Sequence, residues 1–281
     1  MAFWRGLGLV VLVLLGVIIA VLRGVDALGK APVIPELYVP PAFSVARDFD
    51  FGRFRLAWRG VGFIVHPLNR PDQVLWRVEG GFLAAGKGLA EVPDARPGRE
   101  LRDDRELLCR EQSLEVFERL GRQLQLKGHL RCSDGSLSRY LLLLEDDGEQ
   151  GVKLTVTLSE SKLNRLYLTW HRDAEERFFG FGEVSGVYDL SGRRLAVSPA
   201  AKGRPGQGGA NLATYWTSRV RAFHSQSSAY QVFDLRDSRR VSLEVHDGRL
   251  LANIYTGESL DELRARLSSA TGVVPTGPSA K

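Results

Sequence analysis

The chain has 281 residues, of which 44% are hydrophobic and 25% are charged. This composition excludes a disordered or low-complexity protein, and the length allows one large domain or two small ones with a packed core. The 38 Lys and Arg residues exceed the 33 Asp and Glu residues, which gives a net charge of +5, but no dense basic run occurs. We therefore expect a mixed-charge surface and no nucleic-acid partner.

The N-terminal segment predicts a membrane anchor. Every residue in 6–22 is apolar or glycine, and Arg5 and Arg23 bound this run. A helix rising about 1.5 Å per residue over the run comes close to the hydrocarbon core of a bilayer, about 30 Å thick. Residues 1–30 are then one transmembrane helix with its flank, and the globular part is exported to the periplasmic or extracellular face. A cleaved signal peptide, with a weak cleavage site at 27–29, and a buried core helix are the alternatives.

Prolines and glycines mark the two ends of the globular part. Residues 31–42 contain four prolines, which disfavour a helix or a central strand, so this segment is expected to be an extended linker. The globular domain is expected over 43–272. Residues 273–281 contain two prolines and a glycine and are expected to form a disordered tail.

From residue 43 onward, short apolar runs alternate with turn residues, which is typical of an all-β domain. Several runs alternate apolar and polar residues with a period of two, as expected when one face of a strand packs on a core. The middle of the chain, 113–171, is expected to form an antiparallel meander, and the four leucines of 141–144 a strand buried on both faces. The predicted strands are 60–67, 74–78, 113–120, 122–132, 137–145, 152–158, 163–171, 230–235, 241–245 and 250–255.

One α-helix is predicted near the C-terminus. Ser259 and Glu262 have the spacing at which a hydroxyl and a carboxylate cap the first turn of a helix. Leu260, Leu263 and Leu267 then form an apolar stripe, and Thr271-Gly272 ends the helix. The sequence shows no internal repeat, so an antiparallel β-sandwich that ends in a short α-helix is the simplest architecture.

The residue types needed for catalysis or metal binding are not clustered in the sequence. Cys109 and Cys132 either form a disulfide, worth about 3 kcal/mol in the chain-entropy model if the domain is exported, or remain two partly buried thiols. Neither has a His or Cys at metal-ligand spacing. The glycines of 180–182 lack the third glycine and the following helix of a dinucleotide-binding loop. We therefore expect no catalytic residue, no metal and no cofactor. The five histidines are scattered without ligand spacing: His66, His129, His171, His224 and His246.

One stretch, 177–216, is a candidate binding region. It contains a long loop, 198–214, rich in Gly, Pro, Ala and Asn, and such a loop in a compact domain is usually functional or disordered. Tyr215 and Trp216 follow the loop and would present flat apolar faces to a sugar ring. The alternative is that both are core residues that open the next strand. The loop side chains expected to form hydrogen bonds with the sugar are Arg204, Gln207 and Asn211.

This stretch resembles the N-terminal domain of glycoside hydrolase family 31. Residues 178–183, Phe-Phe-Gly-Phe-Gly-Glu, and 188–194, Tyr-Asp-Leu-Ser-Gly-Arg-Arg, are similar to that domain's aromatic-Tyr-Gly-x-Gly-Glu and x-Asp-Leu-Arg-Gly-Arg signature. Gly-Gly at 208–209, the Ser- and Tyr-containing segment 225–233, and Tyr-Thr-Gly-Glu-Ser at 255–259 follow in the order of the family. The subgroup it resembles is the sulfoquinovosidase-like α-glycosidases.

The resemblance, which runs over 60–272, implies a galactose-mutarotase-like β-sandwich beside a (β/α)8 barrel. In the family the nucleophile and the acid/base aspartate lie in that barrel, and we expect this chain to lack it. The resulting hypothesis is a membrane-anchored, non-catalytic carbohydrate-binding or accessory domain with an α-glycoside as ligand. One alternative is the N-terminal half of a split or truncated α-glycosidase with a separate catalytic barrel. Another is an envelope protein-interaction domain without sugar binding.

Overall fold

The computed structural model describes residues 31–91, 102–148, 151–181, 189–197 and 213–272. The chain divides into two compact units, Met1–Val33 and Ile34–Lys281, and the second is described below. The predicted anchor, 1–30, and the predicted tail, 273–281, lie outside the described residues. Within the described ranges, no helix combines the length and apolar character needed to cross a membrane.

The described part of the second unit consists almost entirely of β-strands. The strands are β1 (Glu36–Tyr38), β2 (Arg47–Phe51), β3 (Phe54–Trp58), β4 (Gly62–Pro67), β5 (Trp76–Glu79), β6 (Leu83–Glu91), β7 (Arg102–Ser113), β8 (Val116–Leu120), β9 (Gln123–Cys132), β10 (Leu137–Asp146), β11 (Gly151–Leu158), β12 (Arg165–His171), β13 (Phe178–Gly180), β14 (Arg194–Val197), β15 (Thr214–Thr217), β16 (Arg221–Ser225), β17 (Gln231–Asp234), β18 (Arg240–Val245) and β19 (Arg249–Thr256). A 3-10 turn, Pro41–Phe43, and one α-helix, α2 (Leu260–Thr271), complete the described elements.

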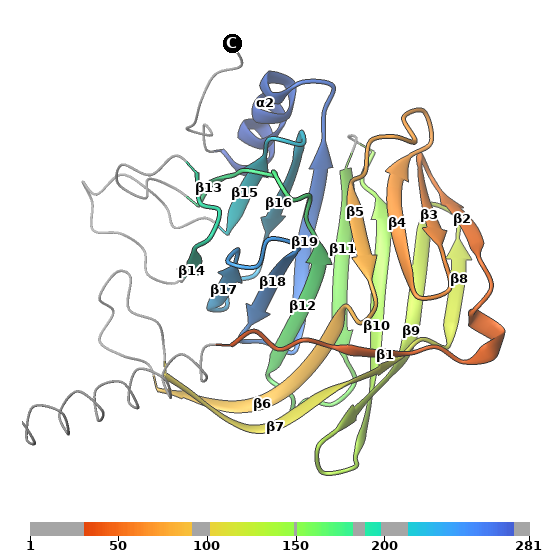
Figure 1. The fold of residues 1–281 in the computed structure, drawn as a ribbon, viewed down its shortest axis with the longest axis vertical. Coiled ribbons are helices and arrows are strands. Elements are labelled where there is room, and N and C mark those ends of the chain that lie inside the picture. Colours follow the sequence, from red (N-terminus) through yellow and green to blue (C-terminus); the bar gives the residue numbers. More distant parts are fainter. Residues whose placement is uncertain (1–30, 92–101, 149–150, 182–188, 198–212, 273–281) are drawn as a thin grey trace, which may run out of the picture. The chain divides into compact units, whose positions relative to one another are not determined.

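The strands form two sheets. The larger has the order β13-β15-β16-β19-β11-β10-β9-β7-β6-β12-β18-β17-β14, with β1 beside β7 and β8 beside β9, and the smaller has the order β2-β3-β4-β5. β1 pairs with β7 in parallel, whereas the pairings along the main path, such as β9 with β10, are antiparallel. In Figure 1 the long strands β6 and β7 run along the bottom and connect the two halves of the larger sheet.

The larger sheet folds back on itself, and both sheets enclose one apolar core. Trp170 of β12 stacks on Phe223 of β16, and Tyr215 of β15 meets Phe233 of β17 edge to face, so strands from opposite halves of the sheet are in contact. The smaller sheet packs over the remaining part, where Phe117 of β8 contacts aromatic rings of β2 and β3. The architecture is therefore a β-sandwich.

The predicted all-β fold is confirmed, but the meander was only partly right. β9, β10 and β11 are consecutive antiparallel neighbours, as expected. β12 instead pairs with β6 and β18, because the free edge of β11 is taken by β19. The predicted strand 113–120 is divided between the end of β7 and β8. Within 141–144, Leu142 and Leu144 are buried while Leu141 and Leu143 are half-buried, so the expectation of burial on both faces was wrong.

The predicted C-terminal helix is confirmed with its caps. The Ser259 hydroxyl accepts a hydrogen bond from the Glu262 backbone N–H (3.2 Å), and the Glu262 carboxylate accepts one from the Glu258 backbone N–H (2.6 Å). Gly272 ends the helix in the left-handed region (φ 70°), where glycine carries no Cβ penalty. Leu263 and Leu267 are fully buried, as their stripe predicted.

The segment 31–42, expected to be an extended linker, contributes to the sheet. Glu36–Tyr38 form β1, which pairs with Glu111–Ser113 of β7. The proline-rich part that follows makes the 3-10 turn. Among the described strands, β1 is an edge strand and pairs on one side only. Prolines, which have no backbone N–H, are therefore tolerated next to it.

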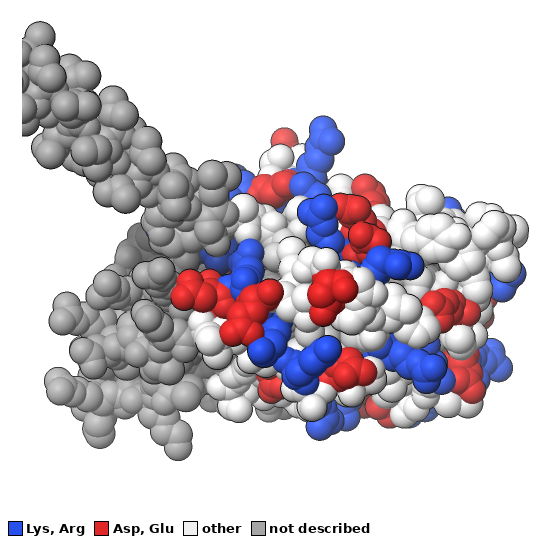
Figure 2. All heavy atoms as spheres, turned by 90° about the horizontal axis from the view of Figure 1, so that it is seen from below, with Lys and Arg blue, Asp and Glu red and all other residues white. Residues whose placement is uncertain are grey.

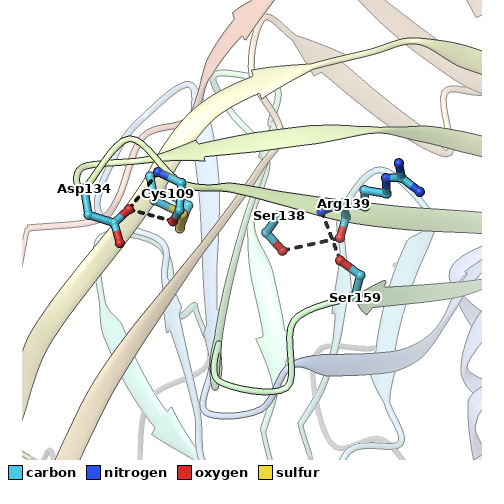
Figure 3. The surroundings of a disulfide bond; sticks show 7 residues. Cys109, Asp134, Ser138, Arg139 and Ser159 are labelled. Carbon is cyan, nitrogen blue, oxygen red and sulfur yellow. Dashed lines mark hydrogen bonds between the residues drawn. A yellow bond between two sulfur atoms is a disulfide. The ribbon is translucent and has the colours of Figure 1, made fainter.

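Cys109 of β7 and Cys132 of β9 are register partners and form a disulfide. Figure 3 shows this disulfide beside the β9–β10 turn, where the Asp134 carboxylate accepts hydrogen bonds from the backbone N–H (2.9 Å) and the hydroxyl (2.6 Å) of Ser136. The disulfide is one of the two alternatives that the sequence left open. It ties β7 to β9 across the irregularity in their register.

Charges of both signs are mixed on the face that β6 and β7 form. Figure 2 shows Lys and Arg interspersed with Asp and Glu on this face. Lys87 of β6 and Glu106 of β7 form an exposed ion pair there, with Nζ 2.5 Å from Oε2. Nucleic-acid binding needs clustered basic residues, and this face does not provide such a cluster.

Candidate functional site

The two predicted aromatic residues of β15 point to opposite faces of the sheet. Tyr215 points into the sandwich, where its ring lies 5.8 Å from that of Phe223, and it is 5% exposed. Trp216 points outward but is only 1% exposed, because α2 covers this end of the outer face. In Figure 1, α2 lies at the end of β16 and β19.

Trp216 belongs to a small apolar cluster beneath α2. Its ring stacks on Phe179 of β13, with centroids 4.4 Å apart, and the Arg264 guanidinium lies 5.5 Å from the ring centroid. Leu263 and Leu267 of α2 cover the cluster. The Trp216 indole N–H has no hydrogen-bond partner within the described residues.

A pocket of about 410 Å³ opens beside this cluster, and we call it the Trp216 pocket. Its size falls within the range of roughly 300–1,000 Å³ that accommodates small ligands. Aromatic and leucine side chains form its apolar part, and arginine, serine and glutamate side chains form its exposed rim. The lining residues are Glu175, Arg177, Phe179, Trp216, Ser218, Arg219 and Leu260.

Two segments that form the walls of the pocket are tied together. The backbone N–H of Arg177 donates to the Ser218 hydroxyl (3.0 Å), and the backbone N–H of Ser218 donates to the Arg177 carbonyl (3.1 Å). Behind them, Arg221 Nε donates to Glu176 Oε1 (2.6 Å), and a second Arg221 N–H donates to Glu176 Oε2. Both side chains are buried, so this bidentate ion pair fixes the wall geometry.

Burial and pairing act on the Arg221 guanidinium in opposite directions. Burial alone lowers the pKa of Arg221, but the hydrogen bonds and the charge of Glu176 outweigh it and raise the pKa above its ordinary value. Arg221 is therefore charged at every physiological pH, and it requires the Glu176 carboxylate as its partner.

Of the five residues predicted to bind sugar, the structure describes two. Arg204, Gln207 and Asn211 lie outside the described residues. Tyr215 and Trp216 are buried and present no open ring face, which agrees with the alternative that both are core residues. Sequence reasoning did not assign Ser218 or Arg219 to a site and gave Leu260 only as part of the helix stripe, because their place at the pocket depends on how α2 packs on the sheet.

A second polar cluster lies on the outer face of β18. One ligand atom each of Asp103, Glu244 and His246 lies within 4.8 Å of the others, which is a spacing that a metal ion would need. However, Arg165 contacts Asp103 at 2.7 Å and Arg105 contacts Glu244 at 3.3 Å. These guanidinium groups occupy carboxylate oxygens and repel a cation, so the cluster is an ion-pair network.

The carboxylates of this network titrate below their ordinary range. Burial by itself raises the pKa of Glu244, but the hydrogen bond from His246 and the charge of Arg105 outweigh burial and lower it. The pKa of Asp103 is lowered in the same way, against burial, by Arg165. Both carboxylates are therefore ionised at neutral pH.

The fold and part of the sequence are similar to glycoside hydrolases. A sulfoquinovosidase of Agrobacterium fabrum is 26% identical over 170 residues, which are 53% of this chain and 25% of that protein. A solved structure of a family 31 sulfoquinovosidase from E. rectale, in complex with the aza-sugar inhibitor IFGSQ, matches with a TM-score of 0.55 and 16% identity over 80% of this chain and 34% of that one. No family model matches the chain.

These matches define the class of the domain. It is a β-sandwich of the kind found in family 31 glycoside hydrolases. More specifically, the chain contains a domain related to the N-terminal β-sandwich of these enzymes, with a sulfoquinovosidase as its sequence relative. The chain spans about a quarter of the length of that relative and about a third of the length of the solved structure.

Proposed function

We propose that this protein is a membrane-anchored, non-catalytic carbohydrate-binding domain with an α-glycoside as ligand. The observation that carries the proposal is the Trp216 pocket on a sandwich related to those of family 31 glycosidases. The half-buried Leu260 matches the apolar C–H face of a sugar ring, and the exposed Arg177, Ser218 and Arg219 provide hydrogen-bond partners for its hydroxyl groups. The related structure from E. rectale contains a sugar-like inhibitor, which is consistent with this class of ligand.

The carboxylates around the pocket support binding without hydrolysis. Glycoside hydrolysis usually requires two carboxyl groups about 5–10 Å apart on opposite sides of the scissile bond. Glu175 is the only acidic residue among the described residues that line the pocket. The neighbouring Glu176 is buried in its bidentate ion pair with Arg221, and Asp173 pairs with Arg219.

Two observations support an anchored and exported location. The apolar run of residues 6–22 is long enough to approach the thickness of a bilayer core. The disulfide between Cys109 and Cys132 is typical of a domain that folds in an oxidising compartment. We place the domain on the periplasmic or extracellular side of the membrane.

A second candidate function follows from the small share of its relatives' length that this chain matches. Because the chain matches only 25% of the A. fabrum sulfoquinovosidase, the domain is alternatively the N-terminal part of a split or truncated α-glycosidase. In that case hydrolytic activity would appear only after the barrel protein is added.

The test is a titration of the full chain in detergent with methyl α-glucoside and methyl α-sulfoquinovoside, with hydrolysis measured in parallel. We expect binding without hydrolysis. Hydrolysis by the chain alone would overturn the non-catalytic role, and no binding of either glycoside would overturn carbohydrate binding.

The choice of variants depends on burial. Trp216→Ala would remove a fully buried ring at a cost of about 3–5 kcal/mol, so it tests folding as much as binding. Arg177→Ala and Arg219→Ala change exposed rim residues and should weaken binding without unfolding the domain. Arg139→Ala, an exposed arginine on β10 several strands away, is the matched control.

A further inference from the structure

A row of uncharged polar side chains crosses the outer face next to the cluster under α2. Thr214 of β15 is in register with His224 of β16, and His224 is in register with Asn253 of β19. Neighbouring strands lie about 4.8 Å apart, so these three side chains form a line across the sheet. Gln226, just beyond β16, reaches the end of this line, and we call the four residues the polar row.

The row begins where the residues on the outer face of β15, β16 and β19 change from apolar to polar. Near α2, this face carries Trp216 of β15, Ala222 of β16 and Tyr255 of β19, which all belong to the apolar cluster. Two residues farther from α2 on each strand, it carries Thr214, His224 and Asn253. α2 packs on Trp216, Ala222 and Tyr255, and the polar row lies two residues farther along each of these strands.

Hydrogen bonds within the row leave donors and acceptors unused. Thr214 Oγ1 is 2.6 Å from His224 Nδ1, and Gln226 Nε2 donates to Asn253 Oδ1 (2.8 Å). Across the described ranges, no further hydrogen bond is formed by His224 Nε2, the Asn253 amide N–H groups or Gln226 Oε1. Asn253 is only 8% exposed, so its amide is recessed. The amide N–H groups of Asn253 are not among the fully buried groups that lack a partner, so water reaches them and a ligand hydroxyl group can replace that water.

The row carries no net charge. Burial lowers the pKa of His224, so its ring is neutral at pH 7 and offers one donor and one acceptor. The next position in register with Asn253 is Lys153 of β11, which in turn is in register with Glu145 of β10. The charges beside the row therefore have opposite signs.

We propose that the polar row is a binding site for the hydroxyl groups of an uncharged sugar. The inference rests on the proposed carbohydrate-binding function. It extends the sugar-binding surface from the Trp216 pocket past Trp216 to the polar row, and it adds the charge of the ligand. Neighbouring hydroxyl groups of a sugar both donate and accept, and amide and imidazole side chains in a line provide matching partners. Trp216 lies two residues from Thr214 on the same face, so the aromatic cluster borders the row.

The experiment is a calorimetric titration of the full chain in detergent with methyl α-D-glucoside and with methyl α-D-glucuronide. We expect Asn253→Ala and Gln226→Ala each to raise the Kd for the glucoside roughly fivefold, as expected for the loss of one hydrogen bond. Thr157→Ala on β11, on the same outer face, is the matched control and should leave the Kd unchanged. The glucuronide should bind more weakly than the glucoside.

The outcomes separate this inference from the proposed function. If the wild-type chain binds neither sugar, both fail. If it binds the glucoside and Gln226→Ala and Asn253→Ala bind within twofold of wild type, the row is not the site, although carbohydrate binding stands. Equal or tighter binding of the glucuronide overturns the preference for an uncharged sugar. Gln226 is exposed, so its variant remains informative if Asn253→Ala unfolds.

Discussion

Replacement of both cysteines gives the sharpest test of how this sandwich is stabilised. Cys109 and Cys132 are 23 residues apart, and for a loop of this length the chain-entropy relation gives about 3.4 kcal/mol at 25 °C. Both are buried, so Cys109→Ala/Cys132→Ala also loses some packing. We expect the double variant to lose roughly 3–4 kcal/mol of unfolding free energy.

The assay is urea unfolding followed by tryptophan fluorescence, with and without dithiothreitol. Wild type should lose stability when reduced, whereas the double variant should be insensitive to the reductant and so provides the control. A loss below about 1 kcal/mol would refute the reasoning, since it would fall under the range usual for native disulfides. Two titratable thiols in the oxidised, denatured wild type would refute the disulfide itself.

Three further changes test other parts of the structure. Glu176→Gln removes the close, bidentate charge partner of the buried Arg221 guanidinium, leaving only Asp173 at 3.9 Å, and should cost about 3–5 kcal/mol in urea unfolding. Ser259→Ala removes the cap of α2 and should cost about 1 kcal/mol, measured by the thermal midpoint. Asp103 and Glu244 have lowered pKa values, so their stabilisation is present above the ordinary carboxyl pKa of about 4 and is lost as pH falls below it. Unfolding free energy should therefore fall from about pH 5 to pH 3, and less so in Asp103→Asn.

The elements that could be predicted are those with one buried face. In β9 and β11, apolar residues alternate with polar ones, and the predicted and observed bounds agree within a residue or so. β15 was anticipated only by the alternative that Tyr215 and Trp216 open a strand, because the period of two is absent in this pair, where the core buries one ring and α2 covers the other. β12 was predicted as a strand, but its partners β6 and β18 are too far away in sequence for a local pattern to identify.

The candidate site was harder to predict than the fold for the same physical reason. Along β15, β16 and β19, Thr214, His224 and Asn253 lie in three separate stretches of sequence, and nothing in any one stretch marks its polar residue as part of a site. Register brings the three into one line, and α2 decides which positions of the outer face are covered. The apolar positions of that face need the helix, because rings the size of Trp216 would otherwise expose a large apolar area to water. The length of α2, which its caps at Ser259 and Gly272 fix, therefore determines how much of the outer face is left for a ligand.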